Sequence, residues 1–113
     1  MQKENIIEFL KQIKNLISKG KYDFITRKYK LPNGERLNYI QSLLEIGLTN
    51  IDDAWKEILS LTPRHYFRGP TPDRDRDGEV WEFKKEINGV MTYIKLKIDR
   101  KRGCVCMSFH KDW

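Results

Sequence analysis

The sequence predicts an α+β domain in which N-terminal helices pack on a C-terminal antiparallel β-sheet. Apolar residues recur at helical spacing through the first half of the chain, and after residue 78 they alternate with polar residues at a period of two. The Asn88-Gly89 pair between two alternating runs is a strong hairpin signal. The 113 residues suffice for one modest core, so we expect a single domain over residues 1–113.

Three amphipathic helices are predicted before the sheet. The first covers residues 4–18, where apolar side chains share one face and Lys and Glu fill the other. The second covers residues 35–46 and ends at Gly47. The third begins after Asn50, a favourable N-cap residue, and ends before Pro63.

Three strands are predicted to follow as an antiparallel meander, over residues 79–87, 90–98 and 104–110. Residues 64–80 are rich in Pro, Gly and Asp and are predicted to form a charged, mobile loop. Residues 21–32 mix β-branched and aromatic residues without a period that selects a helix or a strand.

The charge of the chain favours an anionic partner. The formal net charge is +6, and residues 63–113 hold 12 basic and 8 acidic residues. A basic surface is typical of nucleic-acid binding, although many small basic proteins bind no polyanion. No apolar run approaches the roughly 20 residues of a membrane helix. Charges also interrupt the apolar residues of the N-terminal segment, unlike in a secretory signal, so we expect a cytoplasmic protein without a membrane partner.

The two cysteines, Cys104 and Cys106, are predicted to be reduced and semi-buried. Residues two apart in a strand have Cα atoms roughly 6.5–7 Å apart, at or beyond the usual limit for a disulfide. A Cys-x-Cys pair without further ligands is also a weak metal signal, and we expect no metal or other cofactor.

Strand alternation predicts a polar outward face on the sheet. If Ile94, Leu96 and Ile98 pack against the helices, their neighbours point the other way. The same rule is applied with Val105, Met107 and Phe109 inward on the last strand and with Trp81 and Phe83 inward on the first. The outward residues are then Glu82, Lys84, Tyr93, Lys95, Lys97, Cys104, Cys106, Ser108 and His110, to which the preceding loop can add His65, Tyr66 and Arg68.

These residue types match the needs of metal-free RNA cleavage. The 2′-hydroxyl must lose a proton, the leaving 5′-oxygen must gain one, and cations must stabilise charge on the phosphoryl oxygens. Glu or His can serve as base, and His, Tyr or Lys as acid. Aromatic rings can stack the bases of single-stranded RNA.

Each residue also has an ordinary interpretation. The lysines and the Arg100–Arg102 turn can be solvated groups that prevent edge-to-edge aggregation. Tyr93 can be a cross-strand packing residue, and both histidines can be surface residues. The Asp-rich segment before Gly78 faintly resembles a calcium loop, but the position of the ligand glutamate is occupied by Lys84.

Several short motifs in fixed order resemble the MqsR family of toxins from bacterial toxin–antitoxin systems. The likeness covers about residues 35–110, and its motifs are Tyr66-Phe67-Arg68-Gly69-Pro70, an acidic loop, Val80-Trp81, Tyr93-Ile94-Lys95-Leu96-Lys97 and Ser108-Phe109-His110. The resemblance implies a RelE/YoeB-like fold and an endoribonuclease that cuts mRNA. It also implies a cognate antitoxin that silences the enzyme, with the ribosome as a further candidate partner.

The resemblance also implies roles for individual residues. His110 would act as general acid or base, and Tyr93 would position the phosphate or share in proton transfer. Arg68 and Lys95 would stabilise the phosphorane, and Glu82 would orient one of these groups or act as base. Glu82 stands where the family can have glutamine, and His110 where some members have lysine, so the acid and base assignments stay open. The expected RNA-binding residues are Lys97, Lys84, Tyr66, His65, Arg100, Lys101 and Arg102.

Two other classes of function fit the same residues. The basic sheet could be a non-catalytic nucleic-acid-binding module, or it could be a protein-interaction surface for an acidic partner. A binding module would tolerate loss of His110 or of the Tyr93 hydroxyl and would lose affinity steeply with salt.

Overall fold

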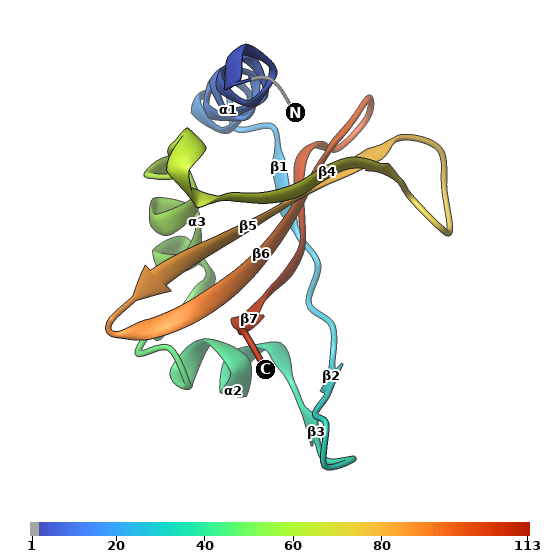
Figure 1. Ribbon diagram of the computed structural model, residues 1–113. Helices are drawn as coiled ribbons and strands as arrows, with labels where there is room; N and C mark the ends of the chain where they lie inside the picture. The colour runs from blue at the N-terminus through green and yellow to red at the C-terminus, as the bar shows by residue number, and fades with distance from the viewer. Residues whose placement is uncertain (1–2) are drawn as a thin grey trace.

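The computed structural model describes residues 3–113, and residues 1–2 of the expected domain lie outside the described residues. Its α-helices are α1 (Lys3–Ser18), α2 (Tyr39–Leu44) and α3 (Ile51–Leu59), and a 3₁₀ turn, η1, covers Pro63–His65. Figure 1 shows α1, α3 and α2 following one another along one side of a sheet. The predicted first and third helices are thus confirmed, and the fold is α+β as expected.

A five-stranded mixed sheet forms the second layer, in the order β1-β7-β6-β5-β4. Its strands are β1 (Tyr22–Phe24), β4 (Tyr66–Pro72), β5 (Glu79–Ile87), β6 (Val90–Asp99) and β7 (Gly103–Lys111). Strand β1 runs parallel to β7, and the other neighbours are antiparallel. The predicted three-stranded meander is therefore the centre of a larger sheet.

The sequence predicted a loop over residues 64–80, but residues 66–72 form strand β4. Pro70 and Pro72 lack the N–H that a central strand would need. They are tolerated because β4 is an edge strand that pairs only with β5. The prolines that favoured a loop are thus compatible with the rim of the sheet.

The second helix is shorter than predicted. Residues 36–37 form β3, which pairs with β2 (Tyr29–Lys30) in a small two-stranded sheet. Helix α2 begins only after Asn38, whose side chain accepts a hydrogen bond from the Gln41 backbone, while the Gln41 side chain accepts one from the Asn38 backbone. This capping box fixes the start of the helix after β3.

A β-bulge in β7 changes which of its side chains face the helices. Leu96 pairs with Cys106, but the preceding residue, Lys95, pairs with Ser108, so Met107 is an extra residue. An extra residue shifts the alternation of one strand relative to its partner. Phe109 points inward as predicted, because it lies after the bulge.

The inward placement predicted for Val105 and Met107 is therefore wrong. Cys104 and Cys106, predicted to face outward, instead lie in the core, fully buried and unpaired. Their reduced state agrees with the prediction, but they are buried and not semi-buried. Burial raises the pKa of the Cys104 thiol to about 12, so this group is chemically quiet at neutral pH.

A close backbone approach holds β1 against β7. The amide of Cys104 donates to the carbonyl of Lys21 at 3.0 Å. Gly103 has φ +80°, and a Cβ at this position would collide with that carbonyl. Only glycine fits here, and it lets the chain after α1 join the sheet.

The core lies between the helices and the inward face of the sheet. The apolar cluster includes Phe9 and Leu10 of α1, Trp55 and Ile58 of α3, Leu43 of α2, and Trp81, Phe83, Ile94, Leu96 and Phe109 of the sheet. Phe9 stacks on Trp81 with ring centroids 4.4 Å apart. Within residues 3–113, no helix is long and apolar enough to cross a membrane.

Candidate functional site

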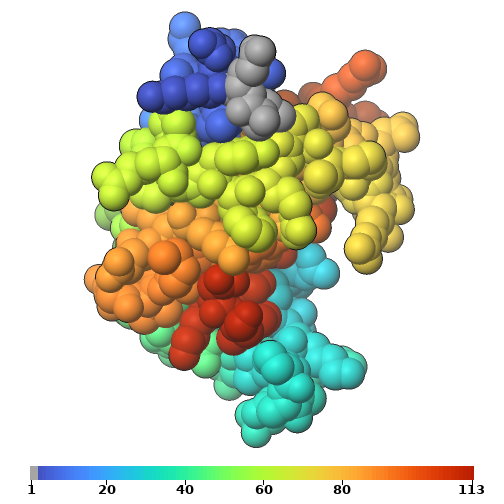
Figure 2. Space-filling model, viewed as in Figure 1, coloured from blue at the N-terminus to red at the C-terminus, as the bar shows by residue number. Residues whose placement is uncertain are grey.

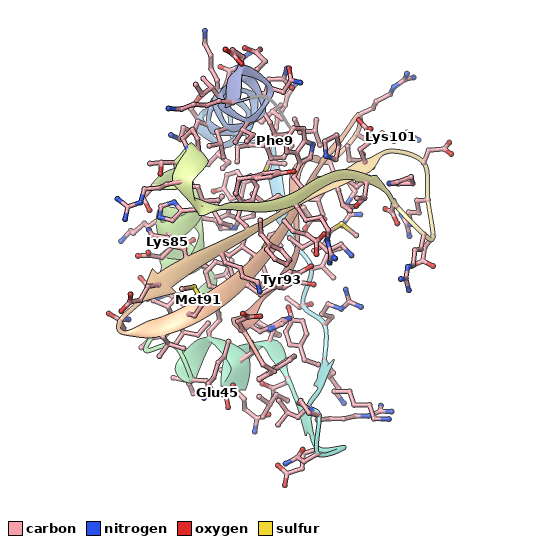
Figure 3. All side chains as sticks on the ribbon, viewed as in Figure 1. Phe9, Glu45, Lys85, Met91, Tyr93 and Lys101 are labelled. Atoms are coloured by element: carbon pink, nitrogen blue, oxygen red, sulfur yellow. The ribbon has the colours of Figure 1, made fainter. Side chains whose placement is uncertain are left out.

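The outward face of the sheet brings several of the expected residues together. Strand register places Glu82 opposite Lys95 and Tyr93 between Lys84 and His110. Tyr93 lies near the middle of this face, as Figure 3 shows. The predicted alternation is thus correct for β5 and β6, and it fails only in the first half of β7.

A hydrogen-bonded network joins Arg68, Glu82 and Tyr93. Arg68 Nε and Nη2 donate to the two carboxylate oxygens of Glu82 at 2.7 and 2.9 Å. The Tyr93 hydroxyl donates to Glu82 Oε1. The Glu82 side chain is only 6% exposed, whereas that of Arg68 is 61% exposed. A buried carboxylate therefore fixes an exposed guanidinium and a phenol side by side.

The network shifts the protonation of its members. The hydrogen bonds from Arg68 lower the pKa of Glu82. Desolvation, followed by the hydrogen bond to Glu82, raises the pKa of Tyr93, and the same carboxylate raises the pKa of Arg68. Glu82 is therefore ionised and a weak base, while Tyr93 keeps its proton at neutral pH.

His110 lies beside this network in an aromatic cage. Its ring stacks on Trp113, with centroids 4.0 Å apart and planes 6° from parallel. Tyr29 meets it edge-on at 4.6 Å, and the Tyr93 ring lies 5.2 Å away. The Tyr29 hydroxyl accepts a hydrogen bond from the Phe109 backbone, which anchors the cage to β7.

The contacts of His110 define its protonation. Nδ1 lies 2.7 Å from the carbonyl oxygen of Lys111. A carbonyl only accepts, so Nδ1 carries a proton and Nε2 of the neutral ring keeps a lone pair. Desolvation in the cage lowers the pKa of His110. The imidazole is thus a neutral proton acceptor at neutral pH.

A polar cleft of about 620 Å³ opens above Glu82 and Tyr93. Its lining includes the cations Arg27, Arg68, Arg74 and Lys95, the carboxylates Asp73, Asp75 and Glu82, and also Tyr93 and Met107. Figure 2 shows a hollow at this side of the molecule, between the yellow loop after β4 and the cyan segment after β1. Met107 reaches the cleft because of the bulge in β7. A separate cavity of about 520 Å³, lined by Phe9 and Trp81, lies between α1 and the sheet, away from these groups.

The cleft has cations that can meet an anionic ligand. Arg27, Arg74 and Lys95 line it, and within residues 3–113 none of them forms an ion pair with a carboxylate. Arg27 Nη1 donates to the Met107 carbonyl at 3.3 Å, which directs its guanidinium across the cleft. Sequence reasoning missed Arg27 and Arg74, because neither lies on a predicted strand. It also missed Tyr29 and Trp113, which only the fold brings to His110.

Lys97 is not free to bind a ligand. Its side chain is 6% exposed, and its ammonium donates to Asp73 Oδ2 at 2.7 Å and to the Asp77 carbonyl at 2.6 Å. The amide of Asp73 donates to the Gly78 carbonyl, and that of Asp75 to the Asp73 side chain. Lys97 therefore ties the acidic segment, which forms a charged loop as the sequence predicted, to β6 beside the cleft.

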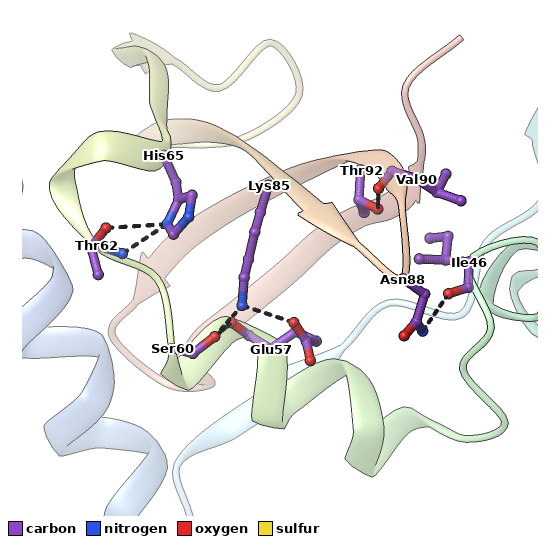
Figure 4. Close-up of polar contacts among 9 residues, drawn as sticks. All are labelled: Ile46, Glu57, Ser60, Thr62, His65, Lys85, Asn88, Val90 and Thr92. Carbon is purple, nitrogen blue, oxygen red and sulfur yellow. Dashed lines mark hydrogen bonds and ion pairs between the residues drawn. The ribbon is translucent and has the colours of Figure 1, made fainter.

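His65 and Tyr66 do not join the outward face, contrary to expectation. Tyr66 pairs with Phe83, an inward residue, and its ring packs edge-on against Trp81 and Phe83. His65 Nδ1 accepts from the Thr62 amide at 3.0 Å and caps η1. Figure 4 shows His65 near Lys85, which binds Glu57 of α3 on the helix side. Neither residue lines the cleft.

Of the remaining expected RNA-binding residues, Arg100, Lys101 and Arg102 lie at the margin of the outward face, whereas Lys84 is opposite Tyr93. Arg102 binds Asp23 through two hydrogen bonds of 2.9 and 2.7 Å, and Arg100 and Lys101 sit in the β6–β7 turn. Lys101 lies at the tip of this hairpin, far from Tyr93 (Figure 3). Lys84 pairs with Asp112 at 3.0 Å.

The described residues 3–113 contain no cluster of three or more His, Cys, Asp or Glu side chains placed to hold a metal ion. In comparisons with known proteins, no family model, curated protein or solved structure matches the chain. The geometry of the outward face and the motifs of the sequence are thus the basis for a functional assignment.

Proposed function

We propose that the protein is a cytoplasmic endoribonuclease toxin of the MqsR kind, with a RelE-like fold, that cleaves single-stranded mRNA without a metal ion. The resemblance of residues 35–110 supports the class and implies neutralisation by a cognate antitoxin, with the ribosome as a further candidate partner. The observation that carries the proposal is the Arg68–Glu82–Tyr93 network, which lies beside His110 and lines a cleft that also holds Arg27, Arg74 and Lys95.

His110 is the proposed general base. Its Nε2 lone pair would take the proton of the 2′-hydroxyl, which then attacks the adjacent phosphorus. The bond from phosphorus to the 5′-oxygen breaks, and that oxygen takes up a proton, which the Lys95 ammonium can supply from the cleft. The products would be a 2′,3′-cyclic phosphate and a free 5′-hydroxyl.

Arg68, Tyr93 and Glu82 would form the phosphate-binding part of the site. The exposed Arg68 guanidinium can stabilise charge on the phosphoryl oxygens, and Tyr93 can position the phosphate. Glu82 is a positioning residue, because its carboxylate is occupied by Arg68 and Tyr93 and is too weak a base for the 2′-hydroxyl. Of the two roles expected for Glu82, we therefore propose that it orients Arg68 and Tyr93 and does not act as the base.

A non-catalytic RNA-binding module is the second candidate. The observation that favours it is that the network is already satisfied internally: Glu82 neutralises Arg68 and accepts the hydrogen bond of the Tyr93 hydroxyl. A module of this kind would use Arg27, Arg74 and Lys95 to hold phosphates and would leave the RNA intact.

The chemistry of the product ends tests the proposal. Purified protein is incubated with a defined single-stranded RNA, and each new 3′ end is analysed. We expect 2′,3′-cyclic phosphate at every cut and no cut at a nucleotide whose 2′-hydroxyl is replaced by hydrogen. Cleavage at 2′-deoxy positions, or intact RNA both in solution and with translating ribosomes, would exclude this mechanism.

A further inference from the structure

Two exposed aromatic rings flank the network on the outward face. Phe67 of β4 is 44% exposed, and Trp113, which follows β7, is 42% exposed. Neither belongs to the apolar core cluster on the helix side of the sheet. Packing of the core therefore does not explain why these rings are where they are.

Trp113 is held in a fixed orientation although it is exposed. Its ring is parallel to His110, and Tyr29 contacts it edge-on with centroids 5.9 Å apart. The preceding amide, that of Asp112, donates to the Met91 carbonyl at 2.8 Å. A ring ordered in advance loses little conformational entropy when a flat ligand stacks on it.

Phe67 is directed outward by an irregularity in β4. Tyr66 pairs with Phe83 and Arg68 pairs with Glu82, so Phe67 is an extra residue between them. The Arg68 guanidinium carbon lies 5.2 Å from the Phe67 ring centroid, and Lys84 Nζ lies 4.0 Å from it. Two cations therefore accompany this exposed ring.

Lys84 connects the two rings. Its ammonium contacts Phe67 and also pairs with Asp112, the neighbour of Trp113, at 3.0 Å. Across β5 and β6, Lys84 is paired with Tyr93. The outward face thus has an aromatic ring on each side of Tyr93, with Arg68 and Lys84 between them.

We propose that Phe67 and Trp113 are stacking sites for two nucleobases of a single-stranded RNA, on either side of the phosphate held at Arg68 and Tyr93. This inference rests on the proposed function. Flat rings with adjacent cations complement a chain of flat bases joined by phosphates, and stacking on aromatic side chains is open to every base. A duplex would not fit, because its bases are already stacked on one another.

Binding of an RNA that cannot be cleaved tests the inference apart from catalysis. A 2′-O-methyl oligonucleotide lacks the attacking hydroxyl but keeps bases and phosphates. Trp113 can report on its own site, because the other two tryptophans, Trp55 and Trp81, are 5% and 9% exposed. We expect binding to quench Trp113 emission, and we expect the quenching to vanish in Trp113→Phe.

Affinity is then measured for Phe67→Ala and Trp113→Ala by fluorescence anisotropy of a labelled oligonucleotide. Each variant should bind about 5- to 150-fold more weakly than wild type, the range expected for one base–aromatic stack. Wild type should bind an oligonucleotide with abasic sites more weakly than the complete one, by a similar factor. The double variant Phe67→Ala, Trp113→Ala should bind the two oligonucleotides with nearly equal affinity. Tyr22→Leu is the matched control, because Tyr22 is also 42% exposed but packs against Trp55 of α3.

The outcomes separate this inference from the proposed function. If wild type cleaves RNA but both alanine variants keep wild-type affinity, the stacking sites are refuted and the ribonuclease stands. If base-dependent quenching and weakened variants occur without any cleavage, the stacking sites stand and the ribonuclease fails. Equal affinity for the abasic and the complete oligonucleotide, or no binding of either, would refute the stacking sites.

Discussion

Arg68 and Glu82 meet through two hydrogen bonds of 2.7 and 2.9 Å, although one side chain is 61% exposed and the other 6%. The buried acid limits the rotation of the exposed guanidinium and aims it at the cleft. The same acid also holds the Tyr93 hydroxyl. One buried carboxylate thus sets the geometry of both groups proposed to bind phosphate.

Glu82→Gln should make stability less sensitive to acid. The pKa of Glu82 is below its ordinary value of 4.5 in the folded protein. Its contribution to the free energy of unfolding is therefore present above pH 4.5 and is lost as the pH falls through the folded pKa. We expect the variant to be about 1–3 kcal/mol less stable than wild type at neutral pH.

Urea unfolding at a series of pH values checks this expectation. The stability gap between wild type and Glu82→Gln should narrow as the pH falls below 4.5. Asp73, whose pKa is also lowered by its bond to Lys97, affects both proteins equally and cancels in the difference. A gap that stays constant across the range would show that ionisation of Glu82 adds nothing to folding.

Tyr93→Phe should separate binding from cleavage. The variant keeps the ring that packs near His110 and removes only the hydroxyl that bonds Glu82. Stability should change by about 0.5–1.5 kcal/mol, the usual net value of one hydrogen bond. Single-turnover cleavage should fall about 100-fold because the phosphate loses its alignment. Tyr22→Phe is the control and should cleave at the wild-type rate. If Tyr93→Phe also cleaved at the wild-type rate, the Tyr93 hydroxyl would have no part in the mechanism.

Trp113→Ala should raise the pKa of His110 toward its ordinary value of 6.5. Desolvation is the largest cause of the lowered pKa, and the stacked Trp113 ring supplies part of it. The chain has two histidines, so both imidazole titrations can be followed by NMR. His65, whose lowered pKa stems from burial and from Lys85, is an internal control that should not move. If the pKa of His110 were the same in Trp113→Ala as in wild type, the Trp113 ring would not contribute to the desolvation of His110.

Lys97→Met should destabilise the protein by about 3–5 kcal/mol, because it leaves the carboxylate of Asp73 without its partner. Both side chains are 6% exposed, so water cannot readily replace the ammonium. The double variant Lys97→Met, Asp73→Leu should recover most of this loss in urea unfolding. If the single variant lost less than about 1 kcal/mol, the pair would behave as a surface ion pair.

The sequence predicts the parts of the fold that follow a regular period. Alternation correctly places Trp81 and Phe83 inward and Glu82 outward, because β5 pairs with β6 without a break in register. It misplaces Met107, because a bulge adds a residue that no local pattern marks. The sequence also does not reveal strand β1, because β1 pairs with a strand about 80 residues further along the chain, as in Tyr22 with Cys104.

The candidate site was predictable to a similar extent. The outward face holds Tyr93, Lys95 and His110, as expected. Tyr93 and Lys95 lie on β6, which pairs with β5 in regular register, and His110 lies after the bulge in β7. Lys97 lies on the same face but is covered by the acidic loop, whose fold depends on a buried ion pair. Trp113 could not be assigned, because its place on His110 exists only in the folded chain.

The most direct test of the ribonuclease proposal is cleavage of a defined single-stranded RNA in EDTA by wild type, His110→Ala and His65→Ala. His65 is the matched control, because it is the only other histidine and it caps η1 on the helix side. We predict cutting by wild type and His65→Ala and a loss of about 100-fold or more in His110→Ala. Equal cutting by all three proteins, or cutting that EDTA abolishes, would contradict it.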